Sequence, residues 1–334
     1  MILVTGGAGF IGSHLVEALL RRGHKVRILD NLSTGKKENL AEATGHPLEK
    51  FAGISRDSPF SILDEKVEFF WGDLRDINIC RKACQGISCV FHLAALGSVQ
   101  RSVEDPLTSH QVNTTGTLNI LLAARDNQAK RLVYASSSSV YGNPASSGEA
   151  EPKKENLPPQ PQSPYAVTKM MGENYCRIFS HLYGLETVTL RYFNVFGPRQ
   201  DPTSIYSAVI PKFITAAQKG ESPVIYGDGT QSRDFTFVEN VTEANLLAMD
   251  IPGVSGQVFN IACGQQTAVN DLLSILQDIS GRKTLAKYVQ PRKGEVRHSW
   301  ASIQLAKTIL QYNVKVGIRE GLSATWNWFQ KNRG

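Results

Sequence analysis

Short apolar runs alternate with amphipathic ones along the first part of the chain. ILVT at 2–5 is a compact apolar run, and SHLVEALLRR at 13–22 places apolar residues at helical spacing up to Gly23. HKVRILD at 24–30 then alternates apolar and polar positions, as a half-buried strand does. A strand, a helix and a strand within about thirty residues predict a βαβ unit.

The same alternation continues to about residue 197. The pattern predicts further strands at 67–74, 89–96, 131–138 and 186–197, and further helices at 115–126 and 164–183. The last helix has Pro164 in its first turn and Gly184 directly after it, which are typical start and stop residues. Alternating strands and helices predict an α/β fold with a doubly wound parallel sheet.

The order of elements becomes looser after residue 197. The pattern there predicts helices near 209–219, 239–250, 269–280 and 318–330, with a short strand at 223–226. We therefore expect a first domain at 1–197 and a smaller lobe at 198–334, with some of the later chain returning to the first domain. The polar stretches 35–66 and 142–163 are predicted as loops, the first with room for one helix.

Composition and charge narrow the class of protein. Of the 334 residues, 41% are apolar and 20% charged, which is typical of a soluble globular protein. No stretch approaches the roughly 20 apolar residues of a membrane span, and glycines break the apolar N-terminus, so neither a membrane segment nor a signal peptide is expected. These features predict a cytoplasmic protein.

The net charge of +6 comes from scattered Lys and Arg residues. Nucleic-acid binding is not expected, because it needs a clustered basic face. A basic balance also suits a small anionic substrate such as a nucleotide. The five cysteines are odd in number and show no CxxC spacing, which favours reduced, packed thiols over disulfides or a metal site.

Gly6, Gly9 and Gly12 lie between the first strand and the first helix. Glycines there let the backbone approach a pyrophosphate, and the helix N-terminus stabilises its charge. Asp30 ends the next strand, where a carboxylate would bind the adenosine ribose hydroxyls and repel a 2′-phosphate, so NAD is favoured over NADP. The alternative interpretation is a tight turn between packed elements with no ligand.

Two further strand ends complete the predicted cofactor site. Asp73 in GDLRD could meet the adenine, and HLAAL at 92–96 places small residues where a cofactor needs room. The residues predicted to contact NAD are Gly6, Gly9, Phe10, Ile11, Gly12, Asp30, Asn31, Ser33, Gly35, Asp73, Leu74, Ala94, Ala95, Tyr165 and Lys169.

ASSSSVYG at 135–142 and SPYAVTKMMGE at 163–173 are predicted to meet at one edge of the sheet. The serines follow a strand, and Tyr165 begins the helix after the next loop, with Lys169 on the same helical face. An ammonium and the positive nicotinamide of NAD+ would both favour the phenolate of Tyr165, which could then act as a general base. The alternative is a solvent-facing helix pair.

The motifs TGGAGFIGSH, HLAA, SSSSVYG, SPYAVTK, LRYFNVFGPRQ and GDGTQSRDFTFVENV follow one another along essentially the whole chain. They resemble those of extended short-chain dehydrogenase/reductases, specifically nucleotide-sugar epimerases. The resemblance implies a Rossmann-type domain with a smaller C-terminal α/β substrate lobe, and tightly bound NAD that is recycled. It also implies that the catalytic serine is Ser137, four residues before the tyrosine of VYG.

The resemblance implies a reaction as well. Tyr165 would remove the proton of the sugar 4-hydroxyl as hydride leaves C4, and a 4-keto sugar would turn over before hydride returns to its other face. Related dehydratases carry Asp and Glu where this chain has Ser138 and Ser139, and related uronate decarboxylases carry Glu at Ser139. Elimination needs an acid at the leaving hydroxyl and epimerisation does not, so epimerisation is favoured.

Substrate contacts are implied in the same way. Asn194, Arg233 and Arg292 would bind the diphosphate or sugar, since arginines suit phosphates. The full set of expected substrate residues is Gly97, Ser98, Ser138, Asn194, Tyr226, Arg233, Arg292, Glu295 and Ser299. Glu295 would bind the uridine ribose, and Tyr226 would lie near the uracil. GSVQRS at 97–102 also resembles the sugar-contacting loop of N-acetylhexosamine epimerases.

Ser299 bears on the choice of sugar. Relatives restricted to glucose and galactose have a tyrosine at the matching position, and those with a small residue accept an N-acetyl group. We therefore expect a UDP-N-acetylglucosamine/UDP-N-acetylgalactosamine 4-epimerase, or one acting on their uronic acids. UDP-glucose/UDP-galactose or UDP-glucuronate remain alternatives, although glucuronate epimerases tend to carry Thr at Asn194. A non-catalytic NAD-binding sensor is the alternative from another class.

The resemblance also implies a homodimer through the helices at 100–124 and 165–183.

Overall fold

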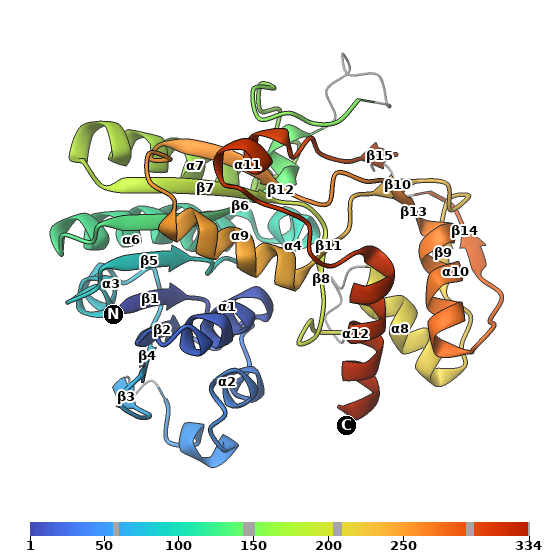
Figure 1. Ribbon diagram of the computed structural model, residues 1–334, viewed down its shortest axis with the longest axis horizontal. Helices are drawn as coiled ribbons and strands as arrows, with labels where there is room; N and C mark the ends of the chain where they lie inside the picture. The colour runs from blue at the N-terminus through green and yellow to red at the C-terminus, as the bar shows by residue number, and fades with distance from the viewer. Residues whose placement is uncertain (56–59, 143–150, 203–208, 292–296, 333–334) are drawn as a thin grey trace.

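The computed structural model describes residues 1–55, 60–142, 151–202, 209–291 and 297–332. Within them, eight strands form one large sheet in the order β12-β7-β6-β5-β1-β2-β4-β3. These strands are β1 Ile2–Thr5, β2 Val26–Asp30, β3 Phe60–Ile62, β4 Val67–Trp71, β5 Cys89–His92, β6 Arg131–Ser137, β7 Glu186–Tyr192 and β12 Gln257–Ile261. Figure 1 shows the sheet running through the larger part of the molecule.

The sheet is parallel except at one edge, where β3 pairs antiparallel with β4. The strand order reverses at β1, because β2 and β4 lie on one side of it and β5, β6 and β7 on the other. The predicted doubly wound parallel sheet is therefore confirmed. In such sheets the carboxyl ends of the strands beside the reversal form a crevice that binds ligands.

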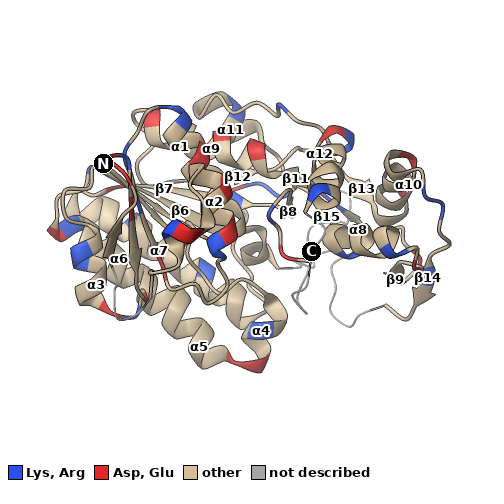
Figure 2. Cartoon of the chain, turned by 90° about the horizontal axis from the view of Figure 1, so that it is seen from below, with Lys and Arg blue, Asp and Glu red and all other residues tan. Residues whose placement is uncertain are grey.

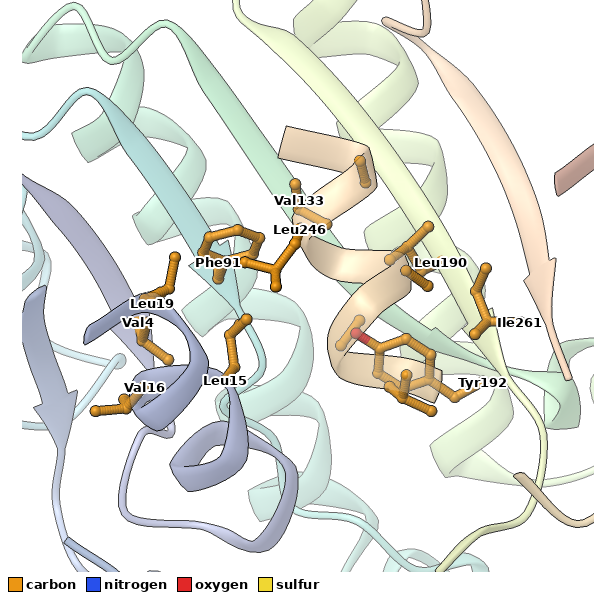
Figure 3. Close-up of a cluster of buried hydrophobic side chains, with 14 of the residues drawn as sticks. Val4, Leu15, Val16, Leu19, Phe91, Val133, Leu190, Tyr192, Leu246 and Ile261 are labelled. Carbon is orange, nitrogen blue, oxygen red and sulfur yellow. The ribbon is translucent and has the colours of Figure 1, made fainter. Parts of the chain in front are cut away.

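Helices cover both faces of the sheet. On one face lie α1 Phe10–Arg21, α2 Lys37–Thr44, α9 Val238–Asp250 and α11 Gln304–Ile309; on the other lie α3 Ile77–Ala83, α6 Gly116–Asp126 and α7 Pro164–Tyr183. Side chains alternate between the faces along each strand, so Val4 and Leu3 join different cores. Figure 3 shows Leu15 and Leu19 of α1 and Leu246 of α9 on the first face.

Several predicted strands end earlier than expected. The strands predicted at 67–74 and 89–96 stop at Trp71 and His92. Beyond Trp71 the chain turns at Gly72, whose N–H still donates to Asp30 O, and Asp73 then accepts from the Arg75 N–H. The strand predicted at 186–197 breaks at Asn194, which has a φ of 34°, into β7 and β8 Val195–Phe196.

Short elements were missed by the sequence pattern. α3, α4 Val99–Glu104, α5 Pro106–His110, β3 and β12 were not predicted. The helix predicted at 115–126 is the last part of a longer run, in which α5 continues through a π-helical turn at Gln111–Thr115 into α6. Short helices show too few turns for an apolar period to be recognised. Two short 3-10 helices, Leu48–Phe51 and Ser138–Tyr141, complete this region.

A smaller group of elements lies beside the carboxyl edge of the sheet, at the right of Figure 1. Its elements are α8 Val209–Lys219, β9 Val224–Tyr226, β10 Ser232–Arg233, β11 Thr236–Phe237, β13 Thr267–Ala268, α10 Val269–Ser280, β14 Lys287–Val289, β15 His298–Ser299 and α12 Ile318–Lys331. Phe213, Phe235, Leu272 and Leu322 belong to its separate core. Between these elements in sequence, β12 returns to the large sheet and pairs with β7.

None of the helices in the described ranges is long and apolar enough to span a membrane. Lys and Arg are interspersed with Asp and Glu along the elements drawn in Figure 2. Some of these charges are paired, as in Arg22 with Asp250 and Arg319 with Asp278. All five cysteines are free thiols, and four of them are buried.

Candidate functional site

A cavity of about 410 Å³ opens at the carboxyl edge of the sheet, where β1, β2, β4, β5 and β6 end. It is lined by nearly all the residues predicted to contact NAD: Gly6, Gly9, Phe10, Ile11, Gly12, Asp30, Asn31, Ser33, Asp73, Leu74, Ala94, Ala95, Tyr165 and Lys169. Gly35 lines a neighbouring cavity of about 620 Å³, together with Ser33 and Lys36.

The glycine turn is tightly closed between β1 and α1. Gly6 has a φ of +71°, and a Cβ on Gly12 would lie 2.1 Å from the Gly6 carbonyl oxygen. Gly9 is the residue directly before α1. It has no side chain that could accept hydrogen bonds from the N–H groups in the first turn of this helix. Such N–H groups bind phosphate oxygens. The turn therefore fits the pyrophosphate of a dinucleotide.

Asp30 holds the turn as well as facing the cavity. Its Oδ2 accepts a hydrogen bond from Ala8 N at 3.0 Å, and its Oδ1 accepts from Leu32 N at 2.8 Å. Burial raises the pKa of Asp30, while these two hydrogen bonds oppose the rise. A carboxylate oxygen can accept more than one hydrogen bond, so Asp30 can anchor the loop and still bind ribose hydroxyls. The sequence predicted only the second role.

Asp73 lies beside Asn31 at the ends of neighbouring strands. The Asn31 amide donates to Asp73 Oδ2 at 3.0 Å, and Arg75 forms an ion pair with the same carboxylate at 2.8 Å. Arg75 is the main cause that holds the pKa of Asp73 low, so Asp73 is ionised and can accept from an adenine amino group. Arg75 was not predicted, although it follows Asp73 closely in sequence.

Tyr165 and Ser137 meet as predicted from the order of elements. Burial has the larger effect on the phenol of Tyr165 and raises its pKa, while hydrogen bonding by the Ser137 hydroxyl lowers it. Desolvation therefore opposes the phenolate in the protein alone, so the predicted phenolate depends on positive charges close to the ring. Ser102 of α4 orients the start of α7 by accepting from Tyr165 N at 3.0 Å.

Lys169 is buried behind Tyr165. Its ammonium donates to the Ala135 carbonyl at 2.7 Å and lies 5.1 Å from the Tyr134 ring centroid and 6.0 Å from that of Tyr165. Burial lowers the pKa of Lys169 to about 8, and the Glu173 carboxylate opposes that shift. With a pKa of about 8, the lysine is still largely protonated at neutral pH, and its position on the same face of α7 places it beside the phenol.

The four serines at the end of β6 have different partners. Ser136 hydrogen-bonds to Glu173, which also forms a buried ion pair with Arg191 at 2.7 Å. Ser137 contacts Tyr165 and accepts from Ser139 N at 3.2 Å. Ser138 begins the 3-10 turn and is partly exposed. Ser137 is the serine of the run that affects the pKa of Tyr165.

Two buried residues support the site and were missed by the sequence analysis. Asn113, in the π-helical turn, clamps Leu96 by accepting from its N–H at 2.7 Å and donating to its carbonyl at 3.2 Å. His92 lies between the Thr5 and Thr117 hydroxyls, at 2.8 and 2.9 Å, and burial lowers its pKa to about 3. A polar residue inside an apolar run was the signal available at His92, whereas Asn113 lies in the polar stretch 109–117, which gives no such signal.

A second cavity, of about 380 Å³, lies between the large sheet and the smaller lobe. It is lined by Ser98, Asn194, Tyr226 and Arg233 among the predicted substrate residues, and also by Gln100 and Lys212. Gly97 lines the first cavity instead. Ser299 pairs with Arg233 in the small sheet, and Ser138 lines neither cavity. Arg292 and Glu295 lie outside the described residues.

Backbone strain marks both sides of the second cavity. Ser98 has a φ of 127° and caps α4 by accepting from Arg101 N, and Asn194 has a φ of 34°. Positive φ values at residues other than glycine are costly and cluster at functional sites. Both residues are among those predicted to contact substrate.

Comparisons with known proteins agree with this arrangement. Residues 2–262 match the NAD dependent epimerase/dehydratase family. The UDP-N-acetylglucosamine 4-epimerase from Methanobrevibacter ruminantium M1, solved in complex with UDP-N-acetylmuramic acid, is 40% identical over 99% of this chain and 98% of its own, with a TM-score of 0.88.

Two other relatives are named for glucose. The Thermotoga maritima UDP-glucose 4-epimerase, solved with UDP-glucose, is 36% identical over 99% of this chain and 98% of its own, with a TM-score of 0.87. The UDP-glucose 4-epimerase of Mycolicibacterium smegmatis is 36% identical over 98% of both chains.

Proposed function

The chain belongs to the NAD-dependent epimerase/dehydratase family, and on this basis we propose a sugar substrate for it. It is an NAD-dependent UDP-sugar 4-epimerase. We propose that it interconverts UDP-N-acetylglucosamine and UDP-N-acetylgalactosamine, or the corresponding N-acetylhexosaminuronic acids, through a 4-keto intermediate.

The placement of the Ser137 hydroxyl where it lowers the pKa of Tyr165, with the Lys169 ammonium 6.0 Å from the centroid of the phenol ring, supports the proposed catalytic roles. Tyr165 takes the proton of the sugar 4-hydroxyl, and Ser137 binds the same oxygen and keeps the phenol in line. Lys169 stabilises the phenolate. NAD, when bound, accepts the hydride of C4 and gives it back, so no net oxidation occurs.

The residues around the first cavity would hold NAD in place. The Gly6–Gly12 turn and the start of α1 bind the pyrophosphate, and Asp30 binds the adenosine ribose. Ala94 and Ala95 leave space beside β5, and Asp73 meets the adenine. Gly35 contributes by its close approach to Ala8 and Asp30, which leaves no room for a side chain there.

Epimerisation, rather than dehydration, is supported by the end of β6. Ser138 and Ser139 occupy the positions where an acid would protonate a leaving hydroxyl, and neither side chain is acidic. Rotation of the 4-keto sugar needs no acid at that point, because the oxygen at C4 stays on the sugar throughout.

The identity of the sugar rests on Ser299 and on the 97–102 segment. Ser299 is a small side chain that pairs with Arg233 in the small sheet, and the proposal is that a small residue there accommodates an N-acetyl group. The relative solved with UDP-N-acetylmuramic acid supports this choice. UDP-glucose and UDP-galactose are the second candidates, because two relatives carry names for glucose.

The protein is also proposed to be a homodimer. Val103 of α4, Leu107 of α5 and Val167 of α7 are exposed apolar side chains on three helices that pack together. Exposed apolar groups of this kind mark protein interfaces. Two copies that join through these helices would cover them.

A substrate panel tests the proposed function. The purified enzyme is incubated with NAD and, separately, with UDP-GlcNAc, UDP-GlcNAcA, UDP-Glc and UDP-GlcA, and products are resolved by NMR. The 4-epimer of an N-acetylated sugar is expected as the main product. Conversion of UDP-Glc or UDP-GlcA alone would refute the choice of sugar, and no product from any of the four would favour an NAD-binding sensor.

The catalytic assignment has its own test. Tyr165→Phe removes the proton acceptor, so turnover is expected to fall by about 10²–10⁴-fold. NAD measured in the denatured, purified variant is expected to equal that of the wild type, because the ring is kept. Turnover near the wild-type rate would refute the assignment of Tyr165 as the base.

A further inference from the structure

Asp234, between β10 and β11, is a carboxylate with no exposed surface. Its Oδ1 accepts from Cys263 N at 2.9 Å, and its Oδ2 accepts from Gly264 N at 3.0 Å and from Ala301 N at 3.2 Å. All of these donors are backbone amides. No ion pair joins Asp234 to another of the described residues.

These contacts join separate parts of the fold. Cys263 and Gly264 follow β12, the edge strand of the large sheet, whereas Ala301 follows β15 of the small sheet. One side chain therefore holds the end of β12 against the small sheet. This junction lies where the two groups of elements meet around the second cavity.

The backbone of Asp234 reaches three of the predicted substrate residues. Its N–H donates to the Ser299 carbonyl at 2.9 Å, and its carbonyl accepts from the Asn194 amide at 3.1 Å. Arg233 is the preceding residue and lines the second cavity. Ser299, Asn194 and Arg233 come from three distant segments, so Asp234 is the point at which they are placed relative to one another.

A buried, ionised carboxylate at Asp234 is by itself unfavourable for folding. Burial raises the pKa of Asp234 to about 6, against the effect of its backbone hydrogen bonds. The titratable groups that face it, Cys263 and Tyr312, are neutral, since the pKa of Cys263 is raised to about 12 and that of Tyr312 is raised further. A buried charge without a cation is costly, and a neutral residue would suffice for packing alone.

We propose that Asp234 is a positioning residue for substrate binding, which sets Arg233, Ser299 and Asn194 in register with the large sheet by collecting the amides of Cys263, Gly264 and Ala301. The proposal rests on the proposed function, because these three residues are among those expected to contact the UDP-sugar. Asp234 itself does not line the substrate cavity.

The test uses the holoenzyme and UDP as the probe. Asp234→Asn keeps the shape of the side chain but puts an N–H₂ group against amide donors. The dissociation constant of UDP, measured by calorimetry, is expected to rise about tenfold or more, as when a buried polar contact is lost. In turnover of UDP-GlcNAc the KM is expected to rise by the same factor, with kcat changed less than about threefold. The NAD content stays that of the wild type.

Two matched variants separate positioning from general damage. Leu322→Ala removes a buried side chain from the core of the same lobe, so it lowers the Tm without weakening UDP binding. Asp278→Asn removes an exposed carboxylate from that lobe and is expected to change neither quantity. A loss of UDP affinity in Leu322→Ala equal to that of Asp234→Asn, at a similar fall in Tm, would overturn the proposal.

The remaining outcomes are also decisive. If Asp234→Asn is recovered only as aggregate, Asp234→Ser, which keeps one hydrogen-bond acceptor, is used in its place. Failure of both variants to fold would show that Asp234 is required for folding and would overturn the positioning role. UDP binding that is unchanged in a folded Asp234 variant would remove this inference alone. Absence of both UDP binding and turnover in the wild type would remove the proposed function with it.

Discussion

The charge state of Tyr165 depends on only a few neighbours. Burial raises the pKa of the phenol and the Ser137 hydroxyl lowers it, so the protein without cofactor favours the neutral form. A positive charge close to the ring is then needed to obtain the phenolate. Lys169, with its own pKa lowered to about 8, supplies that charge at neutral pH and loses it above pH 8.

Replacing Lys169 tests this balance. In Lys169→Met the phenol loses its cation, so its pKa rises and the rising limb of the pH profile of kcat moves to higher pH. At pH 7 the rate is expected to fall about ten- to hundredfold, or one to two pKa units of lost stabilisation. Steady-state rates between pH 6 and 10 measure the shift. Lys82→Met, on the exposed side of α3, is the control; an unshifted profile in Lys169→Met would contradict the role.

Ser299 is the residue at which the sugar is proposed to be chosen. In Ser299→Tyr a ring beside Arg233 occupies the space proposed for the N-acetyl group. We expect kcat/KM for UDP-GlcNAc to fall about tenfold or more while that for UDP-Glc stays within a few-fold. Parallel assays with the two substrates measure the ratio. Ser299→Ala is the control, and an unchanged ratio in the tyrosine variant would retire the idea.

At the scale of elements, the turn between β1 and α1 positions the cofactor site. Its shape depends on contacts that are invisible in a motif, such as the close approach of Gly12 to the Gly6 carbonyl and the hydrogen bond from Ala8 to Asp30. The motif predicted the binding function of the turn. The additional role of Asp30 as its anchor came only from the structure.

Gly12→Ala tests the closure of this turn. The added methyl group would meet the Gly6 carbonyl at 2.1 Å, and overpacking of this kind costs about 1–3 kcal/mol, or ten- to hundredfold in NAD affinity. NAD retained after gel filtration, measured by its absorbance following denaturation, reports the loss. Gly53→Ala is the control, because a Cβ there meets nothing within 4 Å. Full NAD occupancy in Gly12→Ala would contradict the assignment.

The predicted elements differ from the observed ones mainly at their ends. Apolar period located β1, β2, β6, α1 and α7, because each is long enough or sufficiently buried to show it. The end of β5 was misplaced because the residues after it stay apolar while the backbone turns away to Asn113. The end of β4 was misplaced because the turn at Gly72 and Asp73 is followed by the apolar Leu74, which extended the pattern. α4 was also missed. Ser98 caps this helix, but it does so only with a strained φ.

At the scale of the whole molecule, the exposed apolar surface on α4, α5 and α7 is the proposed dimer contact. Leu107 is 65% exposed on α5, which packs against both α4 and α7. The same helices carry Ser102 and Tyr165, which hydrogen-bond to each other. Dimer formation would thus stiffen the helices that hold Tyr165, the proposed base.

A charge at Leu107 tests this contact. Leu107→Asp would bury an unpaired carboxylate in the interface, so we expect a shift from dimer to monomer. Sedimentation velocity over a range of concentrations measures it. Leu285→Asp is the control, as Leu285 is 89% exposed but lies in the smaller lobe. A wild-type protein that is monomeric, or a variant that dimerises equally, would contradict the proposal.

The sequence by itself determined the parallel sheet, the glycine turn with Asp30, and the pairing of a strand-end serine with Tyr165 and Lys169. These follow from local period and from the rule that strand carboxyl ends share one edge, which needs no side-chain coordinates. Tertiary structure alone decided that Asn113 holds Leu96, that β12 is the strand that returns to the large sheet, and that Asp234 joins the segments of three predicted substrate residues. Each of these depends on contacts between residues far apart in the chain, and local pattern carries no information on such contacts.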